Sequence, residues 1–269
     1  KGYNKMVSAV DNPEMMGMEF GVVKMTAGDI MNFDYAQEVV YDLMSGTVTF
    51  AWEGKTETVT RKDCFHEGAI LLHVPQNTAV TITCGADAEI AVARTENKRS
   101  FASRLMRPED CLSANEERGA GQMNECSTRL VRTFFDRSNC PETNFFIGEV
   151  VHFPGKWSSY PPHQHVEPEL YYYKFLPENG YGLAEYGDDA FKVKNNDLTG
   201  MPENVTHSQC AAPGYAEYYL WCIRLQDDKV FLQVFTGSRG ISTGDQVRFL
   251  GRQMQVSSSD ALLGRVFTG

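Results

Sequence analysis

The sequence has no uninterrupted apolar run that approaches the roughly 18 residues a membrane-spanning helix needs. Its opening residues, KGYNK, are not followed by the apolar stretch of an export signal. We therefore expect a soluble, unexported chain with a cytoplasmic location and no membrane partner.

Cysteine is sparse and shows no pattern. The seven cysteines are odd in number, and none of them form a CxxC motif. Neither a disulfide framework nor a zinc finger is indicated. We expect reduced thiols, as in a cytoplasmic protein.

Positive charge is also in short supply. The chain has 25 lysines and arginines against 35 acidic residues, which gives a formal net charge of -10. Such a surface repels the phosphates of nucleic acids, so we expect no nucleic-acid partner. Because the overall field opposes the capture of an anion, any anionic substrate must be held by a local group of arginines.

Helical periodicity is scarce. Most segments are short, rich in Val, Ile, Thr, Tyr and Phe, and separated by Gly, Pro, Asn and Asp, as in residues 46–59 and 78–94. This pattern is typical of antiparallel strands and hairpins. Only the RPED run at 107–110 suggests a short turn of helix. The predicted fold class is all-β.

The two halves of the chain repeat each other weakly, with an offset of about 127 residues. A repeat of this length is the size of a domain, so it indicates an internal duplication. The corresponding segments are Gly21-Val22-Val23 with GEVV (148–151), VPQNTAV (74–80) with MPENVTH (201–207), and ADAEIAVAR (86–94) with YAEYYLWCIR (215–224).

The repeat predicts two β-domains. We place them at residues 15–97 and 128–240, because the stretch 98–127 between them is polar and contains glycine, as a linker should. Residues 241–269 form a tail of unknown role.

A possible metal site lies in the second half. His163 and His165 are two residues apart, so on a strand both imidazoles project from one face. Glu169 follows a turn at Pro168, and His207 comes from a separate strand. Three imidazoles and one carboxylate suit one divalent ion, with zinc or manganese favoured over iron or nickel, and leave room for water or substrate.

The first half lacks these ligands. Val80 stands where the repeat places His207, and residues 28–46 contain no histidine. We therefore predict a metal-free first domain and one metal ion per chain. An HxH pair alone is more often only a polar strand face, but the complete set is a stronger signal. The other histidines (His66, His73 and His152) have no comparable partners, so we interpret them as structural.

The ligand set resembles the two motifs of the cupin superfamily, HxHxxxE and PxGxxH, which lie on a small β-barrel. Asn204 takes the glycine position, and asparagine also enters left-handed turns. Within the cupins, GEVVHFPGKWSSYPPHQH (148–165), PELYYYKF and APGYAEYYL look most like the 5-deoxy-glucuronate isomerases of myo-inositol catabolism. The resemblance implies a bicupin, with two cupin-type β-barrels (double-stranded β-helices). Beyond Arg224 the sequence is not similar to these enzymes.

The resemblance implies a metal-dependent aldose–ketose isomerase, an intramolecular oxidoreductase, whose partner is a small deoxy sugar acid. The short VEP segment before Glu169 is similar instead to 4-deoxy-5-hexosulose-uronate ketol-isomerase of pectin breakdown. A cupin dioxygenase and a non-catalytic sugar-binding bicupin are the competing interpretations. Whether the chain forms a homo-oligomer stays open.

An isomerase needs a group that moves a proton between adjacent carbons. The candidates are Glu169, Tyr171 and Tyr173, with Glu217 as a further one, and the sequence does not rank them.

The resemblance also extends to an arginine pair, Arg129 and Arg132, which could bind a sugar carboxylate in bidentate fashion. Tyr160 and Trp157 could line the pocket. Against this, arginines at a domain junction are as often interdomain pairs, and these aromatic residues could simply pack beneath the barrel mouth.

Overall fold

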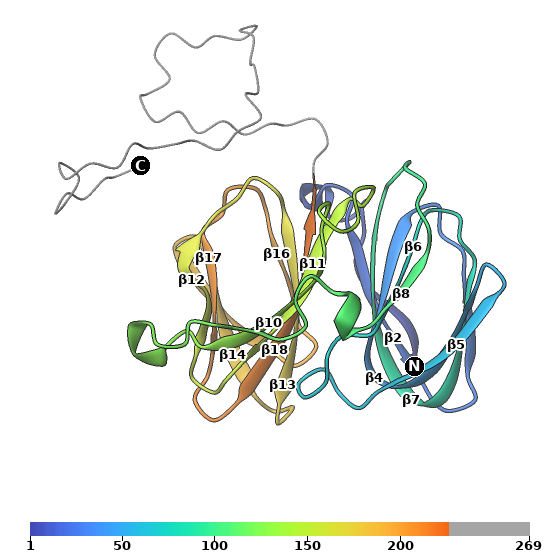
Figure 1. Cartoon of the computed structure of the whole chain (residues 1–269). Coiled ribbons are helices and arrows are strands. Elements are labelled where there is room, and N and C mark those ends of the chain that lie inside the picture. The colour runs from blue at the N-terminus through green and yellow to red at the C-terminus, as the bar shows by residue number, and fades with distance from the viewer. Residues whose placement is uncertain (226–269) are drawn as a thin grey trace, which may run out of the picture. The chain divides into compact units, whose positions relative to one another are not determined.

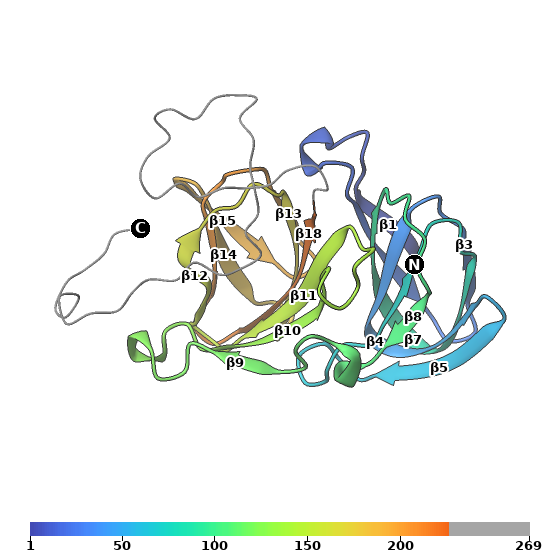
Figure 2. The same cartoon turned by 45° about the horizontal axis from the view of Figure 1, so that its top comes forward.

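Residues 1–225 are described by the computed structural model, and they form two β-barrels that lie side by side (Figures 1 and 2). The predicted all-β class is confirmed. The three helices in this range are single turns, at η1 (Pro13–Met15), η2 (Pro108–Asp110) and η3 (Met123–Glu125). The second of them is the helical turn predicted at 107–110. No helix in residues 1–225 is long and apolar enough to span a membrane.

The first barrel is one eight-stranded sheet in the order β1-β2-β7-β4-β6-β8, with β3 paired to β7 and β5 paired to β4. Its longest strands, β4 and β7, pair antiparallel along most of their length. The strands are β1 (Gly2–Val7), β2 (Glu19–Met25), β3 (Ile30–Phe33), β4 (Glu38–Trp52), β5 (Lys55–Arg61), β6 (Leu71–Val74), β7 (Val80–Thr95) and β8 (Arg104–Met106).

The second barrel consists of two sheets, one of six strands in the order β16-β13-β18-β11-β10-β9 and one of four in the order β12-β17-β14-β15. Its strands are β9 (Glu116–Arg118), β10 (Arg129–Phe135), β11 (Phe145–His152), β12 (Trp157–His163), β13 (Glu169–Leu176), β14 (Tyr181–Tyr186), β15 (Asp189–Lys194), β16 (Leu198–Met201), β17 (His207–Ala211) and β18 (Ala216–Arg224).

The repeat seen in the sequence is visible in the strands. β6 and β16 differ in position by the predicted offset of 127 residues, and so do the first residues of β7 and β17. Asn77 and Asn204, which occupy the same place in the two copies, both adopt a left-handed backbone with φ of 59°. This is the conformation expected of asparagine in the glycine position of the cupin motif.

The boundaries of the barrels differ from the predicted ones. The stretch 98–127 is more than a linker, because β8 pairs with β6 in the first barrel and β9 pairs with β10 in the second. β1, which precedes residue 15, pairs with β2. Strands at the edge of a sheet are short and polar, and so they resemble loops in sequence. Residues 226–240 and the tail 241–269 lie outside the described range.

The interior of the first barrel is filled with apolar side chains, and Val80 is among them. Where the second barrel carries His207, the first therefore has packed hydrophobic core. This position of the first barrel therefore offers no imidazole ligand, and the metal-free first domain stays a prediction.

A second apolar core joins the barrels, since it contains residues of both, such as Phe20 and Phe145. At its border Glu149 accepts hydrogen bonds from Arg61 of the first barrel and Arg132 of the second, each at 2.6 Å. Tyr218 donates to the other oxygen of Glu149 at 2.8 Å. These charges are buried, so each depends on the others for stability.

Candidate metal site and active-site pocket

Three strand ends bring the predicted ligands to one end of the second barrel. His163 ends β12, His207 begins β17 and pairs with it directly, and Glu169 begins β13. His165 lies in the short connection between β12 and β13. One nitrogen from each of the three histidines lies within 4.8 Å of the others. Within residues 1–225 this is the one cluster of His, Cys, Asp or Glu side chains able to hold a metal ion.

Each histidine of the cluster is oriented by a backbone carbonyl. The Nδ1 atoms of His163, His165 and His207 lie 3.2, 2.7 and 2.9 Å from the carbonyl oxygens of residues 159, 167 and 205. A carbonyl only accepts, so each Nδ1 carries a proton, and Nε2 is the nitrogen of each ring that remains for a metal ion. This is the arrangement of metal-binding histidines in proteins.

The chemistry of the cluster fits a metal ion. Nε2 of His207 is buried and has no hydrogen-bond partner among the described residues. Leaving a buried polar atom unpaired is costly, and a bound cation would remove that cost. The three histidines can therefore bind a metal, whose identity the geometry leaves open.

Glu169 lies against the same cluster. Its Oε2 is 3.0 Å from Nε2 of His165 and 3.3 Å from Nε2 of His207. Burial raises the pKa of Glu169, but the interactions with the nearby imidazoles of His165 and His207 outweigh burial, so the net pKa is lowered. The side chain is thus an anionic carboxylate beside the histidines.

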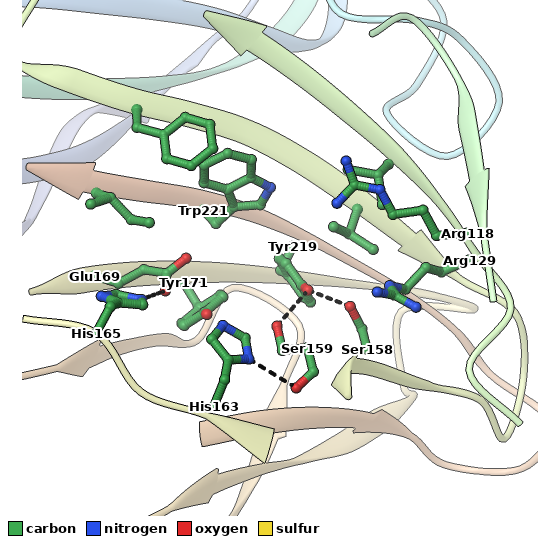
Figure 3. Close-up of a pocket in the computed structure, with 14 residues that line it drawn as sticks. Arg118, Arg129, Ser158, Ser159, His163, His165, Glu169, Tyr171, Tyr219 and Trp221 are labelled. Atoms are coloured by element: carbon green, nitrogen blue, oxygen red, sulfur yellow. Dashed lines mark hydrogen bonds and ion pairs between the residues drawn. The ribbon is translucent and has the colours of Figure 1, made fainter. Parts of the chain in front are cut away.

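A pocket of about 250 Å³ opens beside the cluster (Figure 3). Five of the residues predicted from the sequence line it: Arg129, His163, His165, Glu169 and Tyr171. The other lining residues are Arg118, Val131, Phe146, Val150, Ser158, Ser159, Tyr219, Trp221 and Ile223.

The pocket has two chemically different ends. In Figure 3, Glu169 and His165 lie at one side, and the guanidinium groups of Arg118 and Arg129 lie at the other. Burial lowers the pKa of Arg129 from its ordinary value, and arginine side chains in proteins keep their proton. Arg118 pairs with Glu116 through two hydrogen bonds of 2.9 and 2.7 Å. Both arginines are therefore cations.

Arg132 does not reach the pocket, which corrects its prediction as a substrate ligand. It is 2% exposed, and it donates to Glu149 and to the carbonyl oxygen of Cys64 at the barrel junction. On β10 it is three residues from Arg129, so the two side chains project to opposite faces of the strand.

Three aromatic candidates also lie outside the pocket lining. Tyr173 is buried, and its hydroxyl contacts Thr199 and Gln209 at 2.9 Å. Trp157 is exposed on β12 and packs against Tyr160, with ring centroids 5.6 Å apart. Tyr173 is thus a core residue, while the pocket role of Trp157 and Tyr160 stays a prediction.

Glu217 is likewise absent from the pocket lining. It is fully buried, and neither carboxylate oxygen has a hydrogen-bond partner among the described residues. Burial raises its pKa to about 8. Among the remaining histidines, His73 contacts Glu38 at 2.7 Å, and none of them joins the metal cluster.

Sequence reasoning missed Arg118, Ser158, Ser159, Tyr219 and Trp221. Arg118 lies in the stretch 98–127 that we predicted to be a linker. Only the pairing of β9 with β10 places it opposite Arg129. Tyr219 and Trp221 had a readable signal, because alternation along β18 puts them on one face.

The fold resembles those of solved cupins. An IolB-like protein from Salmonella typhimurium superposes with a TM-score of 0.75 and 22% identity, over 85% of this chain and 91% of that one. A cupin 2 conserved barrel domain protein from Leptotrichia buccalis gives a TM-score of 0.51 and 11% identity, over 82% and 88%. The predicted bicupin fold is confirmed.

The end of the chain matches a different family. Residues 222–251 match the beta-barrel domain of the ATP synthase alpha/beta family. The V-type ATP synthase beta chain of Treponema denticola is 65% identical over 46 residues, which are 17% of this chain and 11% of that subunit. The end of the chain, where we expected no similarity to the isomerases, thus resembles a short part of another protein.

The main part of the chain matches one family throughout. Residues 1–236 match the sequence profile of the KduI/IolB family. The 5-deoxy-glucuronate isomerase of Geobacillus kaustophilus is 30% identical over 233 residues, which cover 77% of this chain and 80% of that enzyme. The chain therefore belongs to the KduI/IolB family and is an isomerase of that family.

Proposed function

We propose that this isomerase converts 5-deoxy-D-glucuronate to 2-deoxy-5-keto-D-gluconate in myo-inositol catabolism. The observation that carries the proposal is the pocket with a histidine cluster and Glu169 at one end and two arginines at the other. A sugar acid has matching chemistry, with a carbonyl beside a hydroxyl at one end and a carboxylate at the other.

His163, His165, His207 and Glu169 would together hold one divalent ion. Such a donor set favours zinc or manganese, with iron and nickel as alternatives. When bound, the ion supplies Lewis-acid stabilisation of negative charge on the carbonyl and hydroxyl oxygens of the sugar.

Arg129 and Arg118 would bind the carboxylate. Arg129 donates one N–H to the carbonyl of Ser127 at 2.7 Å, which fixes the side chain and leaves further N–H groups for a bidentate pair. Glu116 holds Arg118 in place by its two hydrogen bonds. Apolar side chains between the two ends, such as Phe146 and Trp221, exclude water from the reacting carbons.

Glu169 would accept the carbon-bound proton, since it is the one carboxylate that lines the pocket. Tyr171 donates a hydrogen bond to it. Burial raises the pKa of Tyr171 well above its ordinary value, so its hydroxyl stays protonated and supports Glu169 instead of acting as a base.

The segment before Glu169 supports a second candidate substrate, a hexosulose-uronate. His165 and Glu169 are joined by the short VEP segment, which is similar to 4-deoxy-5-hexosulose-uronate ketol-isomerase. Both substrates are sugar acids, so the same two-ended pocket would serve either reaction.

The test is metal analysis of purified protein followed by isomerase assays on both sugar acids. We expect one ion per chain, turnover of 5-deoxy-glucuronate that a chelator removes and added metal restores, and slower turnover of the hexosulose-uronate. The reverse preference would select the second substrate. Oxygen consumption without isomerisation would identify a dioxygenase, and binding without turnover a sugar-binding protein.

A further inference from the structure

The backbone of β12 is irregular where it borders the pocket. Between the pairs Ser158–Gln209 and His163–His207, β12 advances five residues while β17 advances two. Ser159 lies inside this irregular stretch with a φ of 51°. That left-handed conformation is disfavoured for serine, and such backbone strain is concentrated at functional sites.

Because of this irregularity, two neighbouring side chains point into the same pocket. On a regular strand Ser158 and Ser159 would point to opposite faces, yet both line the pocket. Their hydroxyl oxygens lie 2.6 and 3.5 Å from the hydroxyl oxygen of Tyr219 (Figure 3). The carbonyl of Ser159 also accepts the Nδ1 proton of His163. One distortion therefore positions a histidine of the cluster and the Tyr219 hydroxyl together.

Tyr219 is held rigidly from its other sides. Its ring packs edge-on against Tyr171 and His152, with centroids 5.0 and 5.1 Å apart. Burial raises the pKa of its hydroxyl, while hydrogen bonds with the two serines and the charge of Arg129 act in the opposite direction. The charge of Glu169 raises the pKa further, so the phenol keeps its proton at neutral pH and can donate it to a substrate oxygen, while the two serines and Arg129 are the groups that oppose this rise.

We propose that Tyr219 is the catalytic residue that moves protons between the two substrate oxygens, and that Ser158 and Ser159 are its positioning residues. This inference rests on the proposed isomerase function and adds a group for the oxygen-bound protons, since Glu169 is assigned the carbon-bound proton.

The proton movements balance in two steps. As Glu169 takes the proton from C2, the Tyr219 O–H bond breaks and its proton passes to the carbonyl oxygen on C1, giving an enediol. The phenolate then takes the proton from the C2 hydroxyl while Glu169 returns its proton to C1. The product is the ketose, and both side chains regain their starting states.

The experiment compares Tyr219→Phe with Tyr172→Phe in the full chain. Tyr172 is a matched control, because it is also buried and its hydroxyl also makes two hydrogen bonds, to Glu89 and Asn196, away from the pocket. For Tyr219→Phe we expect kcat to fall about 100-fold or more, with KM and metal content near those of wild type. Tyr172→Phe should keep its kcat.

A second variant, Ser158→Ala, removes the shortest hydrogen bond to Tyr219 and should lower kcat by about tenfold with an unchanged KM. This variant tests the role of the Tyr219 hydroxyl if Tyr219→Phe fails to fold. A wild-type kcat in Tyr219→Phe would overturn the role of Tyr219 but leave the proposed isomerase function intact. If Tyr219→Phe is unfolded, a wild-type kcat in Ser158→Ala would have the same meaning. A wild-type protein that isomerises neither sugar acid would overturn the proposed function and this inference with it.

Discussion

At the scale of single residues, the duplication offers a direct comparison between a liganding and a non-liganding position. His207 begins β17 and Val80 begins β7, at equivalent places in the two barrels. Both side chains are about 1% exposed. The same barrel position thus accepts either an imidazole or an aliphatic side chain.

We therefore expect His207→Val to lose metal and isomerase activity while it keeps its fold. Valine already packs at this place in the first barrel, and the change removes a buried nitrogen that has no hydrogen-bond partner within residues 1–225. Metal analysis, activity and a circular-dichroism melt of metal-free protein would check this. The control is Val80→His, which should not create a second metal site. Unfolding of metal-free His207→Val under conditions where metal-free wild type stays folded would contradict the expectation.

The two arginines of β10 should respond differently to replacement by glutamine. Arg129→Gln removes a cation from the pocket, so KM should rise about 10- to 100-fold with metal content and melting temperature unchanged. Arg132→Gln leaves the buried Glu149 with one cation fewer and should destabilise the fold by about 3 kcal/mol. Steady-state kinetics and denaturant titrations separate the two effects. A rise in KM confined to Arg132→Gln would contradict the placement of Arg129 in the pocket.

Glu217 should make stability depend on pH. Burial raises its pKa from the ordinary value of 4.5 to about 8, so the folded protein binds a proton that the unfolded chain releases. Above about pH 4.5 folding must therefore take up a proton, and this cost grows until about pH 8. Glu217→Gln removes it, and should gain on the order of 3 kcal/mol over wild type at pH 7 but little at pH 4. Urea titrations at several pH values would test this, and a pH-independent difference would contradict it.

The sequence pointed to the residues of the histidine cluster, although one premise was wrong. His165 lies in the connection after β12, and not on a strand face shared with His163. The 127-residue offset pointed to His207 by contrast with Val80. Tyr219 could have been found by following the alternation of side chains along β18. Ser159 could not, since its side chain reaches the pocket only through an irregular backbone.

At the scale of strands, the sequence predicted central strands better than edge strands. Central strands such as β4 and β7 are buried on at least one face, so their apolar residues stand out. β9 consists of three exposed polar residues and was placed in the linker. Its pairing with β10 depends on contacts distant in sequence, and this is why Arg118 escaped notice.

Two glycines at equivalent places, Gly21 on β2 and Gly148 on β11, let their strands lie close to neighbouring residues. A Cβ at Gly148 would lie 2.6 Å from the Trp221 ring and 2.4 Å from the carbonyl of Arg132, and one at Gly21 would lie 2.6 Å from the Tyr3 ring. All three distances are shorter than a Cβ atom tolerates, so a side chain at either glycine would require its neighbours to move.

Gly148→Ala should destabilise the protein by about 1–3 kcal/mol and also lower kcat/KM, because Trp221 lines the pocket and must move. Gly21→Ala should cost similar stability but leave kcat/KM unchanged, because Tyr3 does not line the pocket. Kinetics measured below the melting temperature of each variant would test this. Equal losses of kcat/KM in both would show that the effect is general and does not pass through Trp221.

At the scale of the whole molecule, the two barrels depend on each other. They share one apolar core, and Glu149 of the second barrel binds Arg61 of the first. The first barrel therefore supports the site by covering a face of the barrel that carries it.

The second barrel should accordingly not be stable alone. A chain of residues 107–225 would expose core side chains such as Phe134 and Phe145 and leave Glu149 without Arg61. We expect it to bind a hydrophobic dye, to melt without a cooperative transition and to lack isomerase activity. Residues 1–225 provide the control and should fold cooperatively and keep the metal. A folded, active fragment 107–225 would show that the first barrel is dispensable.

The shared core also reflects the internal repeat, because equivalent positions of the two barrels contribute to it. Phe20 pairs with Ala93 in the first barrel, and Ile147 pairs with Cys222 at the equivalent place in the second. All four side chains lie in the core between the barrels. Each barrel thus presents the same face to the other, as the subunits of a two-fold symmetric homodimer do. The two halves of the internal repeat are thus arranged within one chain as the two subunits of such a homodimer would be.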